Sequence, residues 1–341
     1  MRSFATRLLH GLVAFYAASQ GGALAETFAF NAGISITRLA DPVGGGTMQA
    51  ALFYPADGPV QPQRFGPYLV QAGAGARPAA GPFPVVLLSH GSGGGMFSHH
   101  DTATHLARNG YVVAALEHPG DNYRDQRGQG SDLVVAGRVM QLSALLDQLL
   151  ADAAFSSRLD PTRVGVAGFS AGASSALQMV GARPDFALLP RYCACASASV
   201  LCEGGGRIRF SQPPLVARPD PRVRAAFVMG PIGAYFGPEG LAQVGQPVAI
   251  FAAGADEVLP HADNAARVRT LLQTVRRYVE VDRAGHFVFL APCSAELVVA
   301  AAAICNDPPG VDRIKVHETL NTGAAAFFGE ALATGRAGSG R

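Results

Sequence analysis

Short apolar segments alternate with segments of helical periodicity along most of the chain, and this order limits the possible folds more than any other feature. The segments that we expect to form strands are residues 33–38, 48–54, 85–89, 111–116, 163–167, 223–229, 247–253 and 277–281. The expected helices are residues 99–109, 134–152, 171–180, 261–272 and 314–332. Strands that alternate with helices form a mostly parallel sheet with helices on both faces. Ligands of such sheets bind beyond the carboxyl ends of the strands.

Two segments interrupt this order. Residues 57–84 are rich in Pro and Gly, and we expect a long surface connection there. Residues 182–222 form an irregular insertion, which we expect to be part of a cap over the site. The composition, 49% hydrophobic and 15% charged, excludes a disordered or highly charged chain. The sequence therefore predicts one large α/β domain over residues 26–341.

The pattern Gly168-Phe169-Ser170-Ala171-Gly172 lies at the junction between an expected strand and the helix that follows it, and it occurs once in the chain. A serine hydroxyl is a weak nucleophile unless a sharp turn presents it beside a base. Glycine on both sides leaves room for such a turn, because a Cβ there would meet the adjoining strand and helix. The pattern predicts that Ser170 is a catalytic nucleophile rather than part of an ordinary Gly-Ser turn.

A serine nucleophile needs a base at the same end of the sheet, and His286 directly follows the last expected strand. Its near-neutral pKa suits a group that takes the serine proton and returns it to a leaving group. The competing histidines are His118, His261 and His317. His118 also follows a strand and could line the pocket, whereas His317 lies within an expected helix and is interpreted as structural.

The third member is a carboxylate that orients the histidine and stabilises its imidazolium. Asp256 follows the strand expected at residues 247–253 and precedes His286, which gives the chain order Ser, Asp, His of this type of fold. Glu257 is the nearest rival. Asp282 lies too close to the last strand to be preferred.

An oxyanion intermediate requires preorganised N–H donors, usually two backbone amides. The Gly-rich run at residues 89–95 follows the first central strand, and we expect donors from the amides of Ser92 and Ala171. The run lacks the G-K-[ST] ending of a phosphate-binding loop and the last Gly of a dinucleotide motif. The candidates for the lining of a hydrophobic acyl or aryl pocket are His90, Gly91, His118, Phe169 and Phe287, together with Phe97 and Phe289. Core packing is an alternative role for these aromatic residues.

A cluster of His99, His100, Asp101 and His105 raises the alternative of a metal site. The spacing does not match H-E-x-x-H, and Ser98 and Asp101 suit helix capping. We therefore expect neither a metal nor an organic cofactor.

The first 25 residues have the order of a secretory signal. Arg2 and Arg7 precede the apolar residues 8–18, and the small-residue series Ala23-Leu24-Ala25 meets Glu26. This order predicts export, with cleavage after Ala25 and a periplasmic location, because the apolar stretch is too short to span a membrane. A retained membrane anchor is the alternative. No other segment approaches 18 uninterrupted apolar residues, so no integral membrane segment is expected in the mature chain.

The net charge of +2 comes from the signal, which holds two arginines and no acidic residue. The mature chain is formally neutral and has no broad basic field, so nucleic acid is not an expected partner.

Export to an oxidising compartment lets disulfides persist. Cys293 and Cys305 flank a helix-like apolar stretch, and we expect them to pair. Cys193, Cys195 and Cys202 share one loop, where Cys202 is expected to pair with either of the other two. A three-thiolate metal site is the alternative, but no nearby ligand completes a tetrahedral set.

Together, these motifs resemble the α/β-hydrolase superfamily, and in it the branch of dienelactone hydrolases and platelet-activating-factor acetylhydrolase-like esterases. The matching segments are residues 88–94, 117–122, 160–172, 254–256 and 284–287, and the resemblance covers roughly residues 45–332. It implies Ser170 as nucleophile, Asp256 and His286 as its partners, and the Ser92 and Ala171 amides as the oxyanion hole. Dienelactone hydrolases proper have a cysteine in place of Ser170, and lipid-acting relatives commonly have His in place of Phe169, so neither substrate class is carried over.

The sequence as a whole predicts a secreted serine esterase with a small-molecule or lipid-like ester substrate. The alternatives are another acyl hydrolase, such as a polyester hydrolase, peptidase or thioesterase, and a non-catalytic binding protein with the same fold.

Overall fold

The computed structural model describes residues 27–195 and 199–333. The expected signal peptide, residues 1–25, lies outside the described residues. The strands are β1 (Asn31–Ala40), β2 (Thr47–Ala56), β3 (Gln63–Phe65), β4 (Tyr68–Val70), β5 (Gly73–Ala74), β6 (Phe83–Ser89), β7 (Val112–Glu117), β8 (Leu159–Phe169), β9 (Val223–Met229), β10 (Val248–Ala253) and β11 (Val275–Val281). The α-helices are α1 (His100–Arg108), α2 (Arg138–Ala151), α3 (Ala171–Met179), α4 (Leu189–Cys195), α5 (Pro238–Leu241), α6 (Ala265–Leu271), α7 (Ala295–Ala300), α8 (Ala302–Cys305) and α9 (Arg313–Ala331).

The main sheet has nine strands in the order β11-β10-β9-β8-β6-β7-β2-β1-β5. Neighbouring strands from β11 to β7 pair in parallel, whereas β2 is antiparallel to both β7 and β1. This arrangement confirms the expected α/β class with a mostly parallel sheet.

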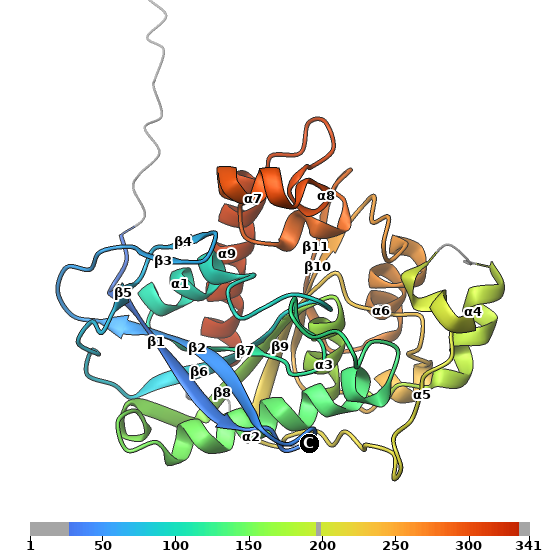
Figure 1. The fold of residues 1–341 in the computed structure, drawn as a ribbon, viewed down its shortest axis with the longest axis horizontal. Coiled ribbons are helices and arrows are strands. Elements are labelled where there is room, and N and C mark those ends of the chain that lie inside the picture. Colours follow the sequence, from blue (N-terminus) through green and yellow to red (C-terminus); the bar gives the residue numbers. More distant parts are fainter. Residues whose placement is uncertain (1–26, 196–198, 334–341) are drawn as a thin grey trace, which may run out of the picture.

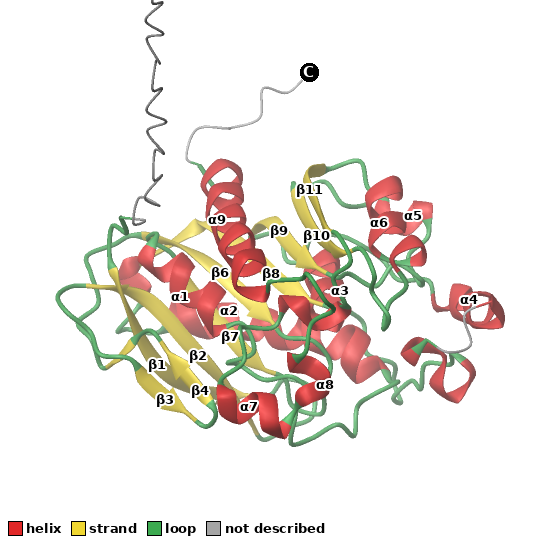
Figure 2. Cartoon of the chain, turned by 90° about the horizontal axis from the view of Figure 1, so that it is seen from above, coloured by secondary structure: helices red, strands yellow, loops and turns green. Residues whose placement is uncertain are grey.

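Helices cover both faces of the sheet, as Figures 1 and 2 show. Alternate residues of β6 separate the two cores: Val85 and Leu87 pack with α2 and α3, and Val86 and Leu88 pack with α1 and α9. Because β6 is buried on both faces, it is apolar throughout rather than alternating.

The register of the central strands brings their carboxyl ends to one edge of the sheet. Ser89 at the end of β6 is paired with Gly168 near the end of β8. Met229 at the end of β9 is level with Phe169 of β8 and with Phe251 of β10. The loops that follow these strands therefore meet at this edge, where the expected site residues lie.

Two segments differ from what the sequence suggested. Residues 57–84 are more than a connection, because they contain the small antiparallel sheet of β3 and β4. Most of the insertion 182–222 is irregular as expected, but it also contains α4. In both views α4 projects from the side of the molecule, away from α7 and α8 (Figures 1 and 2).

One helix among the described residues, Leu133–Ala151, is long and apolar enough to cross a membrane. It begins with a π-helical turn at Leu133–Gly137 and continues as α2. Just over half of its apolar window is buried inside the fold, and Leu142, Leu145 and Leu146 are fully buried. These contacts are those of a core helix.

Candidate active site

Ser170 stands on a tight turn between β8 and α3. Its backbone has φ 55° and ψ −118°, a conformation that non-glycine residues rarely adopt. A Cβ at Gly168 would lie 2.1 Å from the carbonyl oxygen of Gly172, and one at Gly172 would lie 2.0 Å from that of Ser89. Both glycines are therefore required by close backbone approach, as the sequence pattern predicted.

The side chains of Ser170, His286 and Asp256 form one hydrogen-bonded series. Nε2 of His286 lies 3.0 Å from Oγ of Ser170, and Nδ1 lies 2.7 Å from Oδ2 of Asp256. Because a carboxylate can only accept, Nδ1 carries the proton in the neutral ring and Nε2 is free to accept from the serine hydroxyl. The imidazole is 2% exposed, which shields these contacts from water.

The same contacts distinguish Asp256 from its rivals. Its second oxygen accepts from the amides of Val258 and Leu259, at 3.0 and 2.6 Å, which fixes the carboxylate beneath the imidazole. Glu257 accepts instead from the backbone amide of His286, at 3.1 Å, and so holds the loop rather than the ring. Asp282 has an exposed side chain that pairs with Arg283.

The remaining histidine candidates have structural contacts. His317 Nε2 lies 2.9 Å from the carbonyl of Val288, and its Nδ1 lies 2.6 Å from Asp101, so it joins α9 to α1 and to the turn that carries His286. His261 lies against Tyr278, at 2.7 Å. His99 Nδ1 lies 3.0 Å from the carbonyl of Phe289. Over residues 27–195 and 199–333, no group of three or more His, Cys, Asp or Glu side chains is arranged to hold a metal ion.

The Gly-rich loop after β6 is held in place by hydrogen bonds from three of its amides. Gly93 donates to Asp121, Gly94 to the carbonyl of Gly91, and Gly95 to Oγ of Ser98, at 3.2, 3.0 and 3.0 Å. The Ser92 side chain also donates to Asp121, at 2.6 Å. Ala171 is the first residue of α3, where a backbone amide has no acceptor inside its own helix.

A buried arginine supports this loop from below. Arg138 of α2 lies 3.0 Å from Oδ2 of Asp121 in an ion pair whose two side chains are each 1% exposed. The same guanidinium donates to the carbonyls of His90 and Gly91, at 2.6 and 3.3 Å. Arg138 thus holds the carboxylate of Asp121, which binds the Ser92 side chain, and it also holds the backbone of the two residues before Ser92. No local sequence pattern indicates this contact, because Arg138 is distant in the chain and stands in an apolar helix.

His90 and His118 belong to this buried network rather than to the pocket lining. His118 lies between Ser89 and Gln141, at 2.9 and 2.8 Å, and its amide donates to Nε2 of His90. Burial, followed by the positive charge of Arg138, holds the pKa of both histidines well below the usual range. Both rings are therefore neutral, and neither lines the cavity described next.

A cavity of about 520 Å³ is lined by Phe169, the residue that precedes the serine. Gly91, Phe169 and Phe287 line it as expected, and a Cβ at Gly91 would lie 3.4 Å from Cβ of Ser170. Its walls are mainly apolar and come from Phe65 to Tyr68, Met96, Phe97, Leu290, Leu297, Ala301 and Ile304. The carboxylate of Glu117 also lines it, in an ion pair with Arg124.

The cover of this cavity comes from segments other than the expected cap. Apart from residues 91–98, Glu117, Tyr123 and Phe169, the lining residues belong to the hairpin β3–β4 and to residues 287–304, and none of the described residues of 182–222 is among them. The insertion contacts other segments instead: Phe186 lies against Tyr235, which follows β9, and the amide of Asp220 donates to the carbonyl of Met179 at the end of α3. The short hairpin strands carry little periodicity, so only the apolar stretch between Cys293 and Cys305 could have indicated this wall.

Both disulfides agree with the sequence analysis. Cys293 pairs with Cys305 as predicted, and Cys202 pairs with Cys193, which leaves Cys195 free and exposed. Two of the three clustered thiols are thus bonded to each other, which excludes the three-thiolate metal site.

Comparison with known proteins agrees with this architecture. Residues 71–188 match the Dienelactone hydrolase family, an α/β-hydrolase family. Among solved structures, the ferulic acid esterase from Streptomyces cinnamoneus is similar, with a TM-score of 0.63 and 23% sequence identity over 89% of this chain and 91% of that one. No curated protein matches the sequence. The matched fold is the α/β-hydrolase fold that the sequence motifs indicated.

Proposed function

We propose that this chain, a hydrolase by its dienelactone hydrolase family sequence at residues 71–188, is a serine esterase that cleaves carboxylic esters. The observation that carries the proposal is the series Ser170–His286–Asp256, with contacts of 3.0 and 2.7 Å. This is the geometry that makes a serine hydroxyl nucleophilic.

In the proposed reaction, Ser170 attacks the ester carbonyl while His286 takes the hydroxyl proton. The amides of Ser92 and Ala171 stabilise the oxyanion, and Asp256 stabilises the imidazolium. His286 then protonates the leaving alcohol, which gives an acyl-enzyme. Water that loses its proton to His286 hydrolyses this intermediate and restores the serine.

The surroundings favour an uncharged ester with an apolar group. The cavity walls are mostly apolar, and the carboxylate that lines the cavity within the described part of the chain, Glu117, is neutralised by Arg124. A lactone is itself a cyclic ester, so the name of the matched family and that of the similar ferulic acid esterase both agree with cleavage of an ester bond.

The test is turnover and covalent labelling of the full chain. We expect hydrolysis of p-nitrophenyl esters, and fluorophosphonate labelling that mass spectrometry locates at Ser170. Ser170→Ala should lose both, whereas Ser156→Ala, a change in a short helical turn, should retain both. Matched p-nitroanilide and thioester substrates separate the other acyl hydrolases. A wild-type protein that neither labels nor turns over any ester would contradict the proposal.

We also propose that the protein is exported and acts in the periplasm. The order of residues 1–26 supports this location, and so do two disulfides, which persist in oxidising compartments. Expression of the full chain in a bacterium with a periplasm should give an exported form that begins at Glu26. An N-terminus that remains at Met1 in the membrane fraction would instead indicate a retained anchor.

A further inference from the structure

We infer that residues 293–305, closed into a loop by the Cys293–Cys305 disulfide and called here the clasp, determine substrate specificity by forming the outer wall of the cavity. The clasp selects esters that carry one bulky apolar group, aromatic or branched. The inference rests on the proposed esterase function and adds the class of substrate to it.

One face of the clasp lines the cavity. Leu297 of α7, Ala301 between the two helices and Ile304 of α8 are all lining residues. The other face is open to solvent, where Val299 is 86% exposed. The clasp is therefore a thin wall between the cavity and water, and not a part of the core.

Another part of the cavity wall is aromatic. Phe65 of the β3–β4 hairpin stacks on Phe97, with ring centroids 4.7 Å apart and an interplanar angle of 21°, and Tyr68 lies beside them. A group bound in this cavity, called here the slot, can contact both these rings and the aliphatic carbons of the clasp. Such a slot favours a flat or branched apolar group, and an acetyl group leaves most of it unfilled.

Packing alone does not hold the clasp in position. None of the residues of α7 or α8 is buried. Its ion pair to the hairpin, Arg64–Glu296 at 3.5 Å, joins two side chains that are mostly exposed, and such pairs contribute little in water. The disulfide instead holds the two ends of the clasp together, so its helices stay over the cavity.

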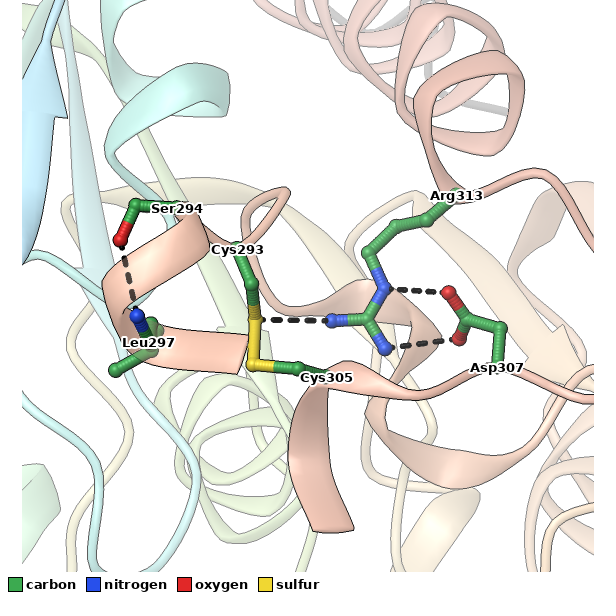
Figure 3. Close-up of a disulfide and its surroundings, with 6 residues drawn as sticks. All are labelled: Cys293, Ser294, Leu297, Cys305, Asp307 and Arg313. Atoms are coloured by element: carbon green, nitrogen blue, oxygen red, sulfur yellow. Dashed lines mark hydrogen bonds and ion pairs between the residues drawn. A yellow bond between two sulfur atoms is a disulfide. The ribbon is translucent and has the colours of Figure 1, made fainter. Parts of the chain in front are cut away.

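A buried ion pair fastens this closed loop to the body of the protein (Figure 3). Arg313, the first residue of α9, donates from Nε and Nη2 to the two carboxylate oxygens of Asp307, at 2.9 and 2.8 Å. Its remaining nitrogen, Nη1, points to Sγ of Cys293 at 3.8 Å. The arginine thus contacts the disulfide and also fixes the chain just beyond Cys305.

The first test opens one disulfide at a time. Cys305→Ala opens the clasp and leaves one thiol, and Cys202→Ala is the matched control because its disulfide does not line the cavity. We compare kcat/KM for p-nitrophenyl acetate with that for the benzoate and a branched acyl ester. A second pair, phenyl and naphthyl acetate, tells whether the alcohol rather than the acyl group occupies the slot.

We expect wild type to prefer the bulky member of one of the two pairs. Cys305→Ala should reduce that preference at least about tenfold, the scale on which pocket contacts discriminate. Cys202→Ala should keep it. The inference fails if acetate is hydrolysed but wild type shows no preference for bulk, or if both variants behave alike.

A second test leaves the disulfide intact. Ala301→Phe fills the slot from the clasp, and it is compatible with folding because Ala301 is not buried. It should lower kcat/KM for the bulky ester more than for the acetate, and Leu297→Ala should widen the range of accepted groups. Unchanged selectivity in Ala301→Phe overturns the inference and leaves the esterase function standing. Absence of any ester turnover overturns both.

Discussion

Asp256 has two roles at the scale of a single residue, because one oxygen faces His286 and the other accepts two backbone amides. The position was predictable from the Ser, Asp, His order, and Glu257 could be set aside only once the fold showed that it binds the amide of His286. The side chains of Asp256 and Glu257 point to different atoms of His286. Which way each one points depends on the backbone turns of the loop, and these cannot be read from the order of residues.

The first prediction concerns this carboxylate. Asp256→Asn retains the shape of the side chain but offers an amide that can stabilise the wrong tautomer of His286 and cannot stabilise its imidazolium. We expect kcat on p-nitrophenyl acetate to fall by about 10⁴-fold with little change in KM. Asp282→Asn is the control, because that carboxylate is exposed and pairs only with the neighbouring Arg283. Equal activity of the two variants would exclude Asp256 as the partner of His286.

The second prediction concerns Arg138 and Asp121. Asp121→Asn leaves the guanidinium buried without its counter-ion and weakens the anchor of Ser92. We expect a loss of about 3–5 kcal/mol in the free energy of unfolding. Because we propose that the Ser92 amide donates to the oxyanion, the variant that remains folded should also have a lower kcat with KM nearly unchanged.

Urea unfolding at pH 7 and steady-state kinetics on the same preparation check this second prediction. The matched control is Arg77→Gln, which breaks an exposed ion pair to Asp57 and should cost about 1 kcal/mol or less. A fall in stability without any fall in kcat would show that the pair supports the fold but not the oxyanion loop.

At the scale of elements, the long periodic helices and buried strands were predictable, and the short covering segments were not. The helix expected at 314–332 forms as α9 at Arg313–Ala331, because a run of this length is specified by its own sequence. Strands β3 and β4 have three residues each, too few to show a period of two. The insertion at residues 182–222 was expected to cover the site because of its place in the sequence. Which loop covers a cavity depends, however, on packing between segments that are distant in the chain.

The third prediction concerns the junction of β8 and α3. A Cβ at position 172 would lie 2.0 Å from the carbonyl oxygen of Ser89. Because that oxygen belongs to the backbone, the clash can be relieved only if β6 moves away from α3. We expect Gly172→Ala to lower the melting temperature strongly and to abolish fluorophosphonate labelling of Ser170. Gly245→Ala is the control, because a Cβ there meets nothing within 4 Å. A Gly172→Ala protein that labels at the wild-type rate would contradict the proposed fit of the turn.

At the scale of the whole molecule, the polar groups beneath the site form part of the folded core. His90, His99 and His118 are each 2% exposed or less, and His99 packs against Phe169, the residue before Ser170. The burial of these histidines could not be predicted from the sequence, because their partners lie on elements that are distant in the chain. Their burial links the stability of the whole protein to pH.

The fourth prediction follows from the protonation of these three rings. Burial is the main cause that lowers the pKa of each, well below the usual range for His90 and His118 and to about 4 for His99. Below pH 6.5 the unfolded chain binds protons at these positions that the native protein does not, so stability falls as the pH falls. Each ring contributes about 1.4 kcal/mol between pH 7.5 and 5.5, or about 4 kcal/mol for the three.

Asp101 does not offset this loss of stability. Burial raises the pKa of its carboxyl, but the charge and hydrogen bond of His317, with a bond from Asn321, outweigh burial and hold that pKa below its usual value. Its stabilising contribution is fully present above pH 4 and is lost only at lower pH, outside the window of the histidines. Urea unfolding of the wild type at pH 7.5, 6.5 and 5.5 measures the predicted slope, and His118→Asn should reduce that slope by the share of one ring. Stability that stays level or rises toward pH 5.5 would show that these histidines take up protons in the native protein.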